Sequence, residues 1–159
     1  MTAVQAIELV RRLAHHSIWG AGSVSVADAR MSRMLRRYLP EYYGALVVFG
    51  VLGFFGGVPA LRDTFGESYA QIVTLVLAIA AAVAAIGETF PAKLWRVEFW
   101  GVAVLMGVII LYGVAIAIAG VVGGDLGRGA VGVEIYASAV LARWRLQDIL
   151  RDRQVHGWR

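Results

Sequence analysis

The sequence predicts an all-α integral membrane protein, a helical bundle with four transmembrane helices preceded by amphipathic helices at the N-terminus. The hydrophobic fraction of the chain is 59% and its mean hydropathy is +0.69. A soluble domain of 159 residues could not hide so much apolar surface without leaving large exposed patches. The apolar residues also gather in long uncharged runs, with Lys and Arg beside them. Lipid is therefore the expected solvent of the central part of the chain.

Residues 1–40 are expected to form a basic amphipathic arm in the cytoplasm. Apolar residues recur at helical spacing over 3–18, and a glycine-containing stretch then breaks the pattern. A second short helix is expected from Ser25, and one of its faces carries four arginines: Arg30, Arg33, Arg36 and Arg37. Such a helix lies naturally at a membrane surface. A solvated helix packed on a partner protein would have the same pattern.

Residues 41–142 are expected to form the transmembrane domain. Three uncharged runs predict its first three spans, at about 42–61, 68–87 and 99–122. A helix of 20 residues, the length of the first two runs, covers about 30 Å at about 1.5 Å per residue, which is the thickness of the hydrocarbon core. The charged segments 62–67 and 88–98 are expected to be loops.

The fourth predicted span, 126–142, contains Arg128 and Glu134, and the distribution of positive charge decides in its favour. With four spans and a cytoplasmic N-terminus, every Lys and Arg except Arg62 and Arg128 lies on the cytoplasmic side. With three spans, the five arginines of the basic helical tail, 143–159, would move outside and the bias would vanish. The sequence therefore predicts a multi-pass protein of the cytoplasmic (inner) membrane with both termini in the cytoplasm.

Glu134 is the candidate for a functional polar group inside the membrane, because an ionisable side chain within a span is costly to keep there. Gln71 and Thr74 begin the second span at a similar depth, and Ser138 follows Glu134 by one helical turn. We therefore expect a polar cluster of Glu134 with Gln71 or Thr74, and with Ser138 nearby. Such a cluster could relay protons or cations, drive assembly, or serve only as a structural hydrogen bond between helices.

Small residues spaced four apart predict close helix packing in the first and third spans. The pairs are Gly53 with Gly57, Ala103 with Gly107, and Gly113 with Ala117. Small side chains let helix backbones approach each other closely. The resulting packing contacts drive helix association in lipid, where the hydrophobic effect does not. The pattern fits packing within one subunit and packing between copies equally well.

The sequence predicts no enzyme, no cofactor and no metal or haem site. Cysteine is absent, which excludes thiolate chemistry and disulfides. The three histidines, His15, His16 and His156, all lie outside the predicted spans. Motifs for phosphate binding, zinc binding or a nucleophile elbow do not occur. The net positive charge flanks the apolar runs, where anionic lipid headgroups explain it, so no nucleic-acid partner is expected.

Parts of the chain resemble the small multispan, holin-like membrane proteins of actinobacterial phages and prophages. The resemblance covers about the last two thirds of the chain, together with the basic N-terminal arm. It is carried by Lys93-Leu94-Trp95-Arg96-Val97-Glu98 leading into Phe99-Trp100-Gly101, by Leu111-Tyr112-Gly113-Val114-Ala115, and by Arg143-Trp144-Arg145-Leu146. Holin-like proteins share no diagnostic motif, and most have fewer spans than the four predicted here.

This resemblance implies a protein that accumulates in the cytoplasmic membrane, self-associates through its spans and permeabilises the bilayer. Two other functions fit the same sequence. One is a non-catalytic subunit or scaffold of a larger membrane complex, docked to its membrane-protein partners by the basic arms. The other is a small channel or transporter that uses Glu134. The expected partners are thus the lipid bilayer and either further copies of the chain or other membrane proteins.

Overall fold

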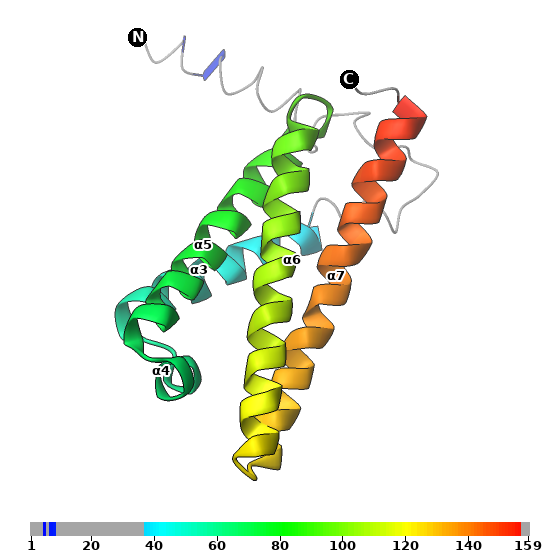
Figure 1. Cartoon of the computed structure of the whole chain (residues 1–159). Coiled ribbons are helices and arrows are strands. Elements are labelled where there is room, and N and C mark those ends of the chain that lie inside the picture. The colour runs from blue at the N-terminus through cyan, green and yellow to red at the C-terminus, as the bar shows by residue number, and fades with distance from the viewer. Residues whose placement is uncertain (1–4, 6, 9–36, 157–159) are drawn as a thin grey trace.

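The computed structural model describes residues 5, 7–8 and 37–156, and the elements of residues 37–156 are all helices (Figure 1). These are α3 (Leu39–Gly56), α4 (Pro59–Phe65), α5 (Glu67–Thr89), α6 (Pro91–Val122) and α7 (Leu126–His156). The predicted all-α class is confirmed. Three helices of the described part are long and apolar enough to cross a membrane: α3, α5 and the Lys93–Val122 part of α6.

Most of the predicted basic arm lies outside the described residues, including Arg30, Arg33 and Arg36. Arg37 is described and exposed, and its Nε lies 3.3 Å from the Glu41 carboxylate one turn further on. Pro40 stands in the first turn of α3, where its missing N–H costs no hydrogen bond. Pro40 therefore begins the first apolar helix.

The first apolar run is wrongly predicted as one helix over 42–61. α3 ends at Gly56, and the separate short helix α4 begins at Pro59. Gly57 has φ of +72°, which only glycine adopts without strain, and Pro59 cannot continue the helical hydrogen bonds of α3. Gly53 and Gly57 therefore do not form a packing pair on one helix, because α3, to which Gly53 belongs, ends before Gly57.

The segment 88–98 is wrongly predicted as a loop. α5 continues to Thr89 and α6 begins at Pro91, so only Phe90 lies between the two helices. Pro91 occupies the start of α6, where proline is well tolerated, and Leu94 departs from helical geometry with φ of −115° and ψ of 20°. The charged residues of this segment therefore lie on helices, and two of them, Glu88 and Glu98, are buried.

α6 and α7 form a long antiparallel hairpin that turns at Gly123 to Asp125 (Figure 1). Gly124 has φ of +72° in the turn, and the Asp125 carboxylate accepts a hydrogen bond of 3.0 Å from the backbone N–H of Arg128. α7 is continuous through the expected boundary at 142 and runs into the tail. The fourth predicted segment and the tail as far as His156 thus form one helix.

Glycines bring the backbones of α6 and α7 into contact. A Cβ at Gly113 would lie 2.6 Å from the backbone nitrogen of Tyr136, and a Cβ at Gly132 would collide with the backbone of Ala117. A Cβ at Gly120 would likewise collide with the backbone of Gly129. Helices packed this closely gain van der Waals contacts. Such contacts drive helix association in a bilayer, because lipid tails are as apolar as the side chains and the hydrophobic effect contributes little.

The other helix pairs also meet at small residues. A Cβ at Gly50 would lie 2.6 Å from the carbonyl oxygen of Thr74 on α5, and one at Gly53 would lie 2.7 Å from the Thr74 methyl group. Gly101 on α6 packs against the backbone of Ala84 on α5 in the same way. α5 therefore lies between α3 and α6, and α6 lies between α5 and α7.

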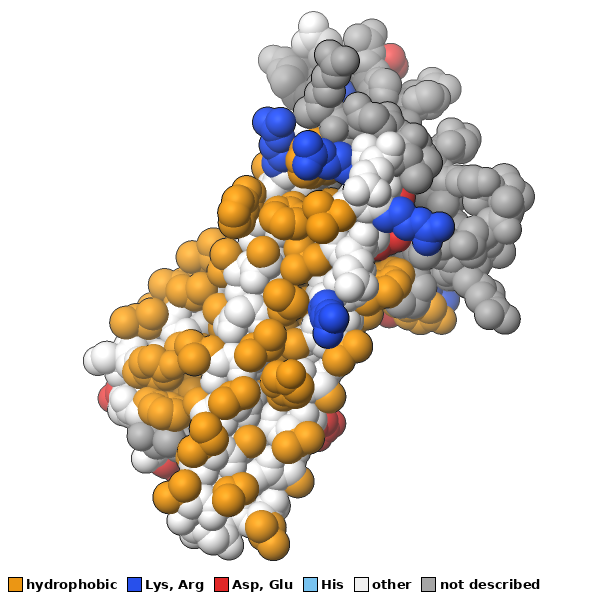
Figure 2. All heavy atoms as spheres, turned by 45° about the vertical axis from the view of Figure 1, so that its right-hand side comes forward, with side chains coloured by type: hydrophobic (Ala, Val, Ile, Leu, Met, Phe, Trp, Pro, Cys, Tyr) orange, Lys and Arg blue, Asp and Glu red, His pale blue; other side chains and the backbone are white. Residues whose placement is uncertain are grey.

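The predicted packing residues divide into two groups. Gly53, Gly113 and Ala117 lie at helix contacts. Ala103 is half-buried on α6, and Gly107 is exposed with open space where a Cβ would stand. The outward faces of the helices carry many large apolar side chains, which cover most of the lower part of the molecule in Figure 2. Lys and Arg gather toward the upper end, as in a protein whose apolar belt contacts lipid.

Gly113→Ala is expected to destabilise the protein by about 1–3 kcal/mol, because the added methyl group meets rigid backbone on α7. Gly107→Ala is the matched control on the same helix, and it should be neutral or slightly stabilising, since alanine favours the helix and the site is open. Reversible unfolding in detergent micelles measures both. Equal stability of the two variants would contradict the close α6–α7 contact.

Candidate functional site

Three of the four buried polar or charged side chains in the described part of the chain are ionisable and lie at one end of the bundle. They are Glu88 at the end of α5, Glu98 near the start of α6 and Arg145 on α7, and each is at most 2% exposed. Ionised side chains are almost never buried so deeply unless they are paired. This group, here called the Arg145 cluster, is the candidate functional site.

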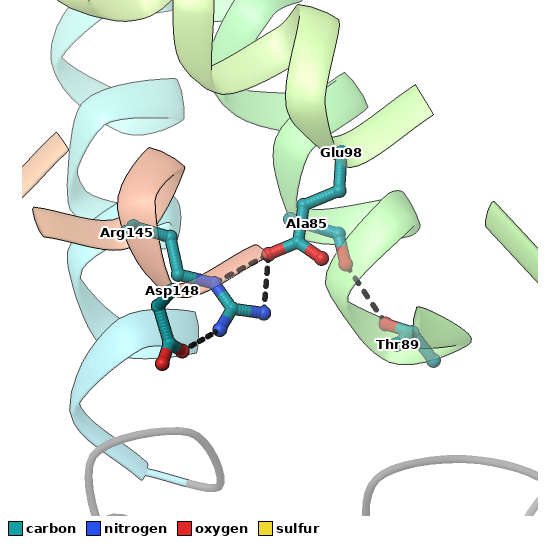
Figure 3. A network of polar contacts seen from close by, with 5 residues as sticks. All are labelled: Ala85, Thr89, Glu98, Arg145 and Asp148. Carbon is teal, nitrogen blue, oxygen red and sulfur yellow. Dashed lines mark hydrogen bonds and ion pairs between the residues drawn. The ribbon is translucent and has the colours of Figure 1, made fainter. Parts of the chain in front are cut away.

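Arg145 is held by carboxylates from two directions (Figure 3). Its Nε and Nη2 atoms each lie 2.6 Å from Glu98 Oε1 across the α6–α7 contact. Its Nη1 atom donates a hydrogen bond of 2.6 Å to Asp148, which lies one turn further along α7. Charge-assisted hydrogen bonds of this length are among the stronger contacts in proteins, and here they join two helices at a defined register.

Glu88 and Tyr43 complete the Arg145 cluster without sharing those hydrogen bonds. Both residues are 1% exposed, and neither Glu88 Oε1 nor the Tyr43 hydroxyl oxygen has a hydrogen-bond partner among the described residues. Tyr43, Glu88, Glu98 and Arg145 lie close enough to act on one another electrostatically. The cluster therefore contains two buried carboxyl groups but only one buried guanidinium.

Local sequence explains how these groups reach the interior. On α6, Trp95, Glu98, Val102 and Leu105 recur at spacings of three and four, so Glu98 continues the buried face of the apolar helix. Gly87 lies directly against the backbone of Glu98, and any Cβ there would collide with it. The absence of a side chain at Gly87 thus lets α5 and α6 close together around the cluster.

Trp95 covers the cluster end of the α6–α7 hairpin. Its ring is 7% exposed, and the guanidinium carbon of Arg153 on α7 lies 4.8 Å from the ring centroid. The guanidinium carbon of neighbouring Arg96 lies 5.3 Å from the same ring. The cation–π contact of Arg153 extends the pairing of α6 with α7 beyond Arg145. Trp100, in contrast, is exposed, as expected for an aromatic residue at a membrane interface.

Arg145 remains positively charged in this environment. Burial by itself lowers the pKa of its guanidinium, but the acidic groups around it, chiefly Glu98, more than offset this effect. The pKa of Arg145 is therefore raised above its ordinary value. A fixed positive charge at this position makes ionised Glu98 its natural counter-ion.

The predicted cluster around Glu134 is not assembled in the structure. Glu134 is exposed on α7, whereas Thr74 is buried on α5 and donates its hydroxyl hydrogen to the carbonyls of Ala70 and Gln71. Ser138 donates to the carbonyl of Ile135 in its own helix. α6 lies between α5 and α7, so equal depth along the bundle does not bring these side chains together.

Glu88 and Glu98 fall in a segment predicted as a loop and Arg145 falls in the predicted basic tail, so the Arg145 cluster is not predicted from the sequence. The signal that identifies Glu98 is the spacing that links it to Val102 and Leu105 beyond the end of the apolar run. Among the residues that the structure describes, no group of three or more His, Cys, Asp or Glu side chains could hold a metal ion. The arrangement can hold charge and protons between four helices.

No protein-family model matches this chain, and no curated protein and no solved structure matches it either.

Glu98→Leu is expected to destabilise the protein by about 3–5 kcal/mol, because it leaves the buried Arg145 without its main counter-ion. Adding Arg145→Met should recover most of that loss, since an apolar pair of similar volume needs no charge compensation. Glu41→Gln, which breaks the exposed pair with Arg37, should cost less than about 1 kcal/mol. Unfolding in micelles measures all three, and a double variant no more stable than Glu98→Leu would contradict the pairing.

Proposed function

We propose that the protein crosses the cytoplasmic membrane four times, self-associates there and permeabilises the bilayer in the manner of holin-like proteins. The observation that carries this proposal is the exposed position of Glu134 on α7. An ionisable group on an outward face inside a membrane needs a polar surrounding. Assembly of several chains supplies one.

The pairing of α7 with α6 supports the fourth span. Contacts between the two helices run from Gly129, which lies against Gly120, to Arg153, which lies over Trp95. α7 thus accompanies α6 along nearly all of the Lys93–Val122 candidate span. A helix paired in this way crosses whatever its partner crosses. The four-span topology then puts both ends of the described chain, with the Arg145 cluster, on the cytoplasmic side.

Glu134 lies well inside the apolar layer in this topology. It follows the turn residue Asp125 by nine residues, a helical rise of about 13 Å. The outward side chains around it include Val131, Val133 and Val140, which are all exposed. A carboxylate in lipid at such a depth costs about 2.5–3.5 kcal/mol on insertion scales. That cost favours association of chains through this part of α7.

A path for solutes between chains fits the distribution of polar groups better than a path through one chain. Within the described residues, the buried polar and charged side chains are Thr74 and the members of the Arg145 cluster. Ala130 and Ala137 are exposed on the same side of α7 as Glu134, which permits close approach of a second helix. Several copies joined there would bring their Glu134 side chains together around a shared polar region.

The same exposed face supports the second candidate function, that of a non-catalytic subunit of a larger membrane complex. In that case a different membrane protein covers Glu134. The two functions differ in a simple observation: a permeabilising protein releases solutes when it is the only protein in the bilayer, whereas a subunit needs its partner. A channel or transporter made by a single chain is not favoured, because Glu134 faces outward.

Glu134→Leu is expected to abolish dye release from liposomes that contain only this protein, and to weaken its self-association by roughly tenfold, as the loss of about 1–2 kcal/mol of interhelical hydrogen bonding implies. Glu134→Gln, which retains a hydrogen-bonding side chain, should keep the association but change the ion dependence of release. Val140→Leu, on an exposed apolar position of the same helix, is the control and should behave as the wild type. Dye release by the Glu134→Leu variant at the wild-type level would refute this role of Glu134.

A protease site or reactive tag placed after Arg159 should be accessible only from the cytoplasmic side of sealed vesicles, because four spans return the chain to the side on which it starts. A cysteine introduced at Gly124, in the turn between α6 and α7, should be labelled only from the opposite side. The protein lacks cysteine, so this label is unique. Labelling of both positions from one side would exclude the fourth span.

A further inference from the structure

We propose that the Arg145 cluster is a proton-binding site in which Glu88 carries one exchangeable proton in the folded protein. This inference concerns the cytoplasmic end of a single chain and does not depend on self-association or on permeabilisation. It rests on two buried oxygen atoms of the cluster, Glu88 Oε1 and the Tyr43 hydroxyl, which have no hydrogen-bond partner within the described part of the chain.

The positive charge of Arg145 is already neutralised by other acidic groups. All three nitrogens of its guanidinium are engaged, Nε and Nη2 by Glu98 and Nη1 by Asp148. Glu98 and Asp148 together supply more negative charge than this one guanidinium neutralises. An ionised Glu88 would therefore add a second buried carboxylate beside the one guanidinium that Glu98 and Asp148 already hold, and its Oε1 has no hydrogen-bond partner among the described residues. A carboxyl group in this position stays neutral by keeping its proton.

Every helix packed around Glu88 contributes to its electrostatic environment. α3 brings Tyr43, α6 brings Glu98 and α7 brings Arg145, while Asp148 and Asp152 of α7 act in turn on Glu98. The only cation in this set is Arg145, while the phenol of Tyr43 is neutral at ordinary pH and the remaining groups are acidic. Burial is the main influence that favours the neutral form of Glu88; among its charged neighbours, Arg145 favours the ionised form and Glu98 opposes it.

Release of the proton has a defined structural consequence. The Glu88 carboxyl group loses H⁺ to water and becomes a carboxylate buried among other acidic groups. That charge favours entry of water or separation of α5 from the α6–α7 hairpin, which meet where Gly87 lies against the backbone of Glu98. The site therefore ties the packing of the helices to the proton concentration on the side of the membrane where the cluster lies.

The experiment is thermal unfolding of the full chain in detergent micelles over a series of pH values. A group that binds its proton more tightly when folded stabilises the protein at low pH, and this stabilisation is lost as the pH rises through the range in which the folded group titrates. The melting temperature of the wild type should therefore fall on the alkaline side. Glu88→Gln, which has the shape of the protonated carboxyl group, should remove that fall.

Matched variants separate Glu88 from other groups. Glu67→Gln, exposed at the start of the same helix, should keep the wild-type pH dependence. Glu98→Gln should be less stable than the wild type throughout, because it removes the counter-ion of Arg145. If Glu88→Gln keeps the alkaline fall, the proposal is overturned. The same holds if sodium chloride, compared with choline chloride, restores the stability of the wild type at high pH, because the site would then bind a metal cation.

Infrared spectroscopy provides a second measurement that does not require Glu88→Gln to fold. In a Glu134→Gln background, which removes the other carboxyl group expected within the membrane, the spectrum at neutral pH should retain the C=O stretch of one protonated carboxyl group. That band should disappear on the alkaline side together with the stability. Absence of the band at neutral pH would overturn the proposal.

Discussion

The contact between Arg145 and Glu98 is the constraint on which the arrangement of the helices depends. A guanidinium that is 2% exposed is tolerated only opposite its counter-ion, so α7 has little freedom to slide or rotate along α6. An apolar helix pair in lipid has no comparable preference for one register, because most of its contacts resemble contacts with acyl chains. The ion pair therefore supplies specificity where the hydrophobic effect supplies little.

In the register that this ion pair sets, glycines allow the helix backbones to pack closely. Gly113, Gly120 and Gly132 all meet backbone atoms across the hairpin, in the same register that places Arg145 beside Glu98. Gly87 has the same role between α5 and α6, next to the acidic groups. Polar pairing and small-residue packing thus reinforce each other, and a shift of one helix would break both. Among the described helices, the part of α7 next to the turn packs against α6 (Figure 1), and the outer side of α7 carries exposed residues such as Val133.

The sequence predicts the helices well, because a long uncharged run in lipid can satisfy its backbone hydrogen bonds in few ways other than a helix. It predicts the ends of the helices, and which helices are neighbours, less well. The end of α3 depends on a glycine at positive φ and a proline at 59, and the helical start of α6 depends on Pro91. Glu98 and Arg145 are 47 positions apart, so their pairing follows from tertiary packing that local patterns do not contain. The expected meeting of Glu134 with Thr74 fails for the same reason, since depth along a bundle does not say which helix is adjacent.

The break after Gly56 makes the crossing helices unequal in length. α3 has 18 residues and α6 has 32, which correspond to about 27 Å and about 48 Å of helix. A bilayer that meets a short helix on one flank and a long one on another must thin beside the first, or the long helix must tilt. Either adjustment deforms the surrounding lipid unevenly.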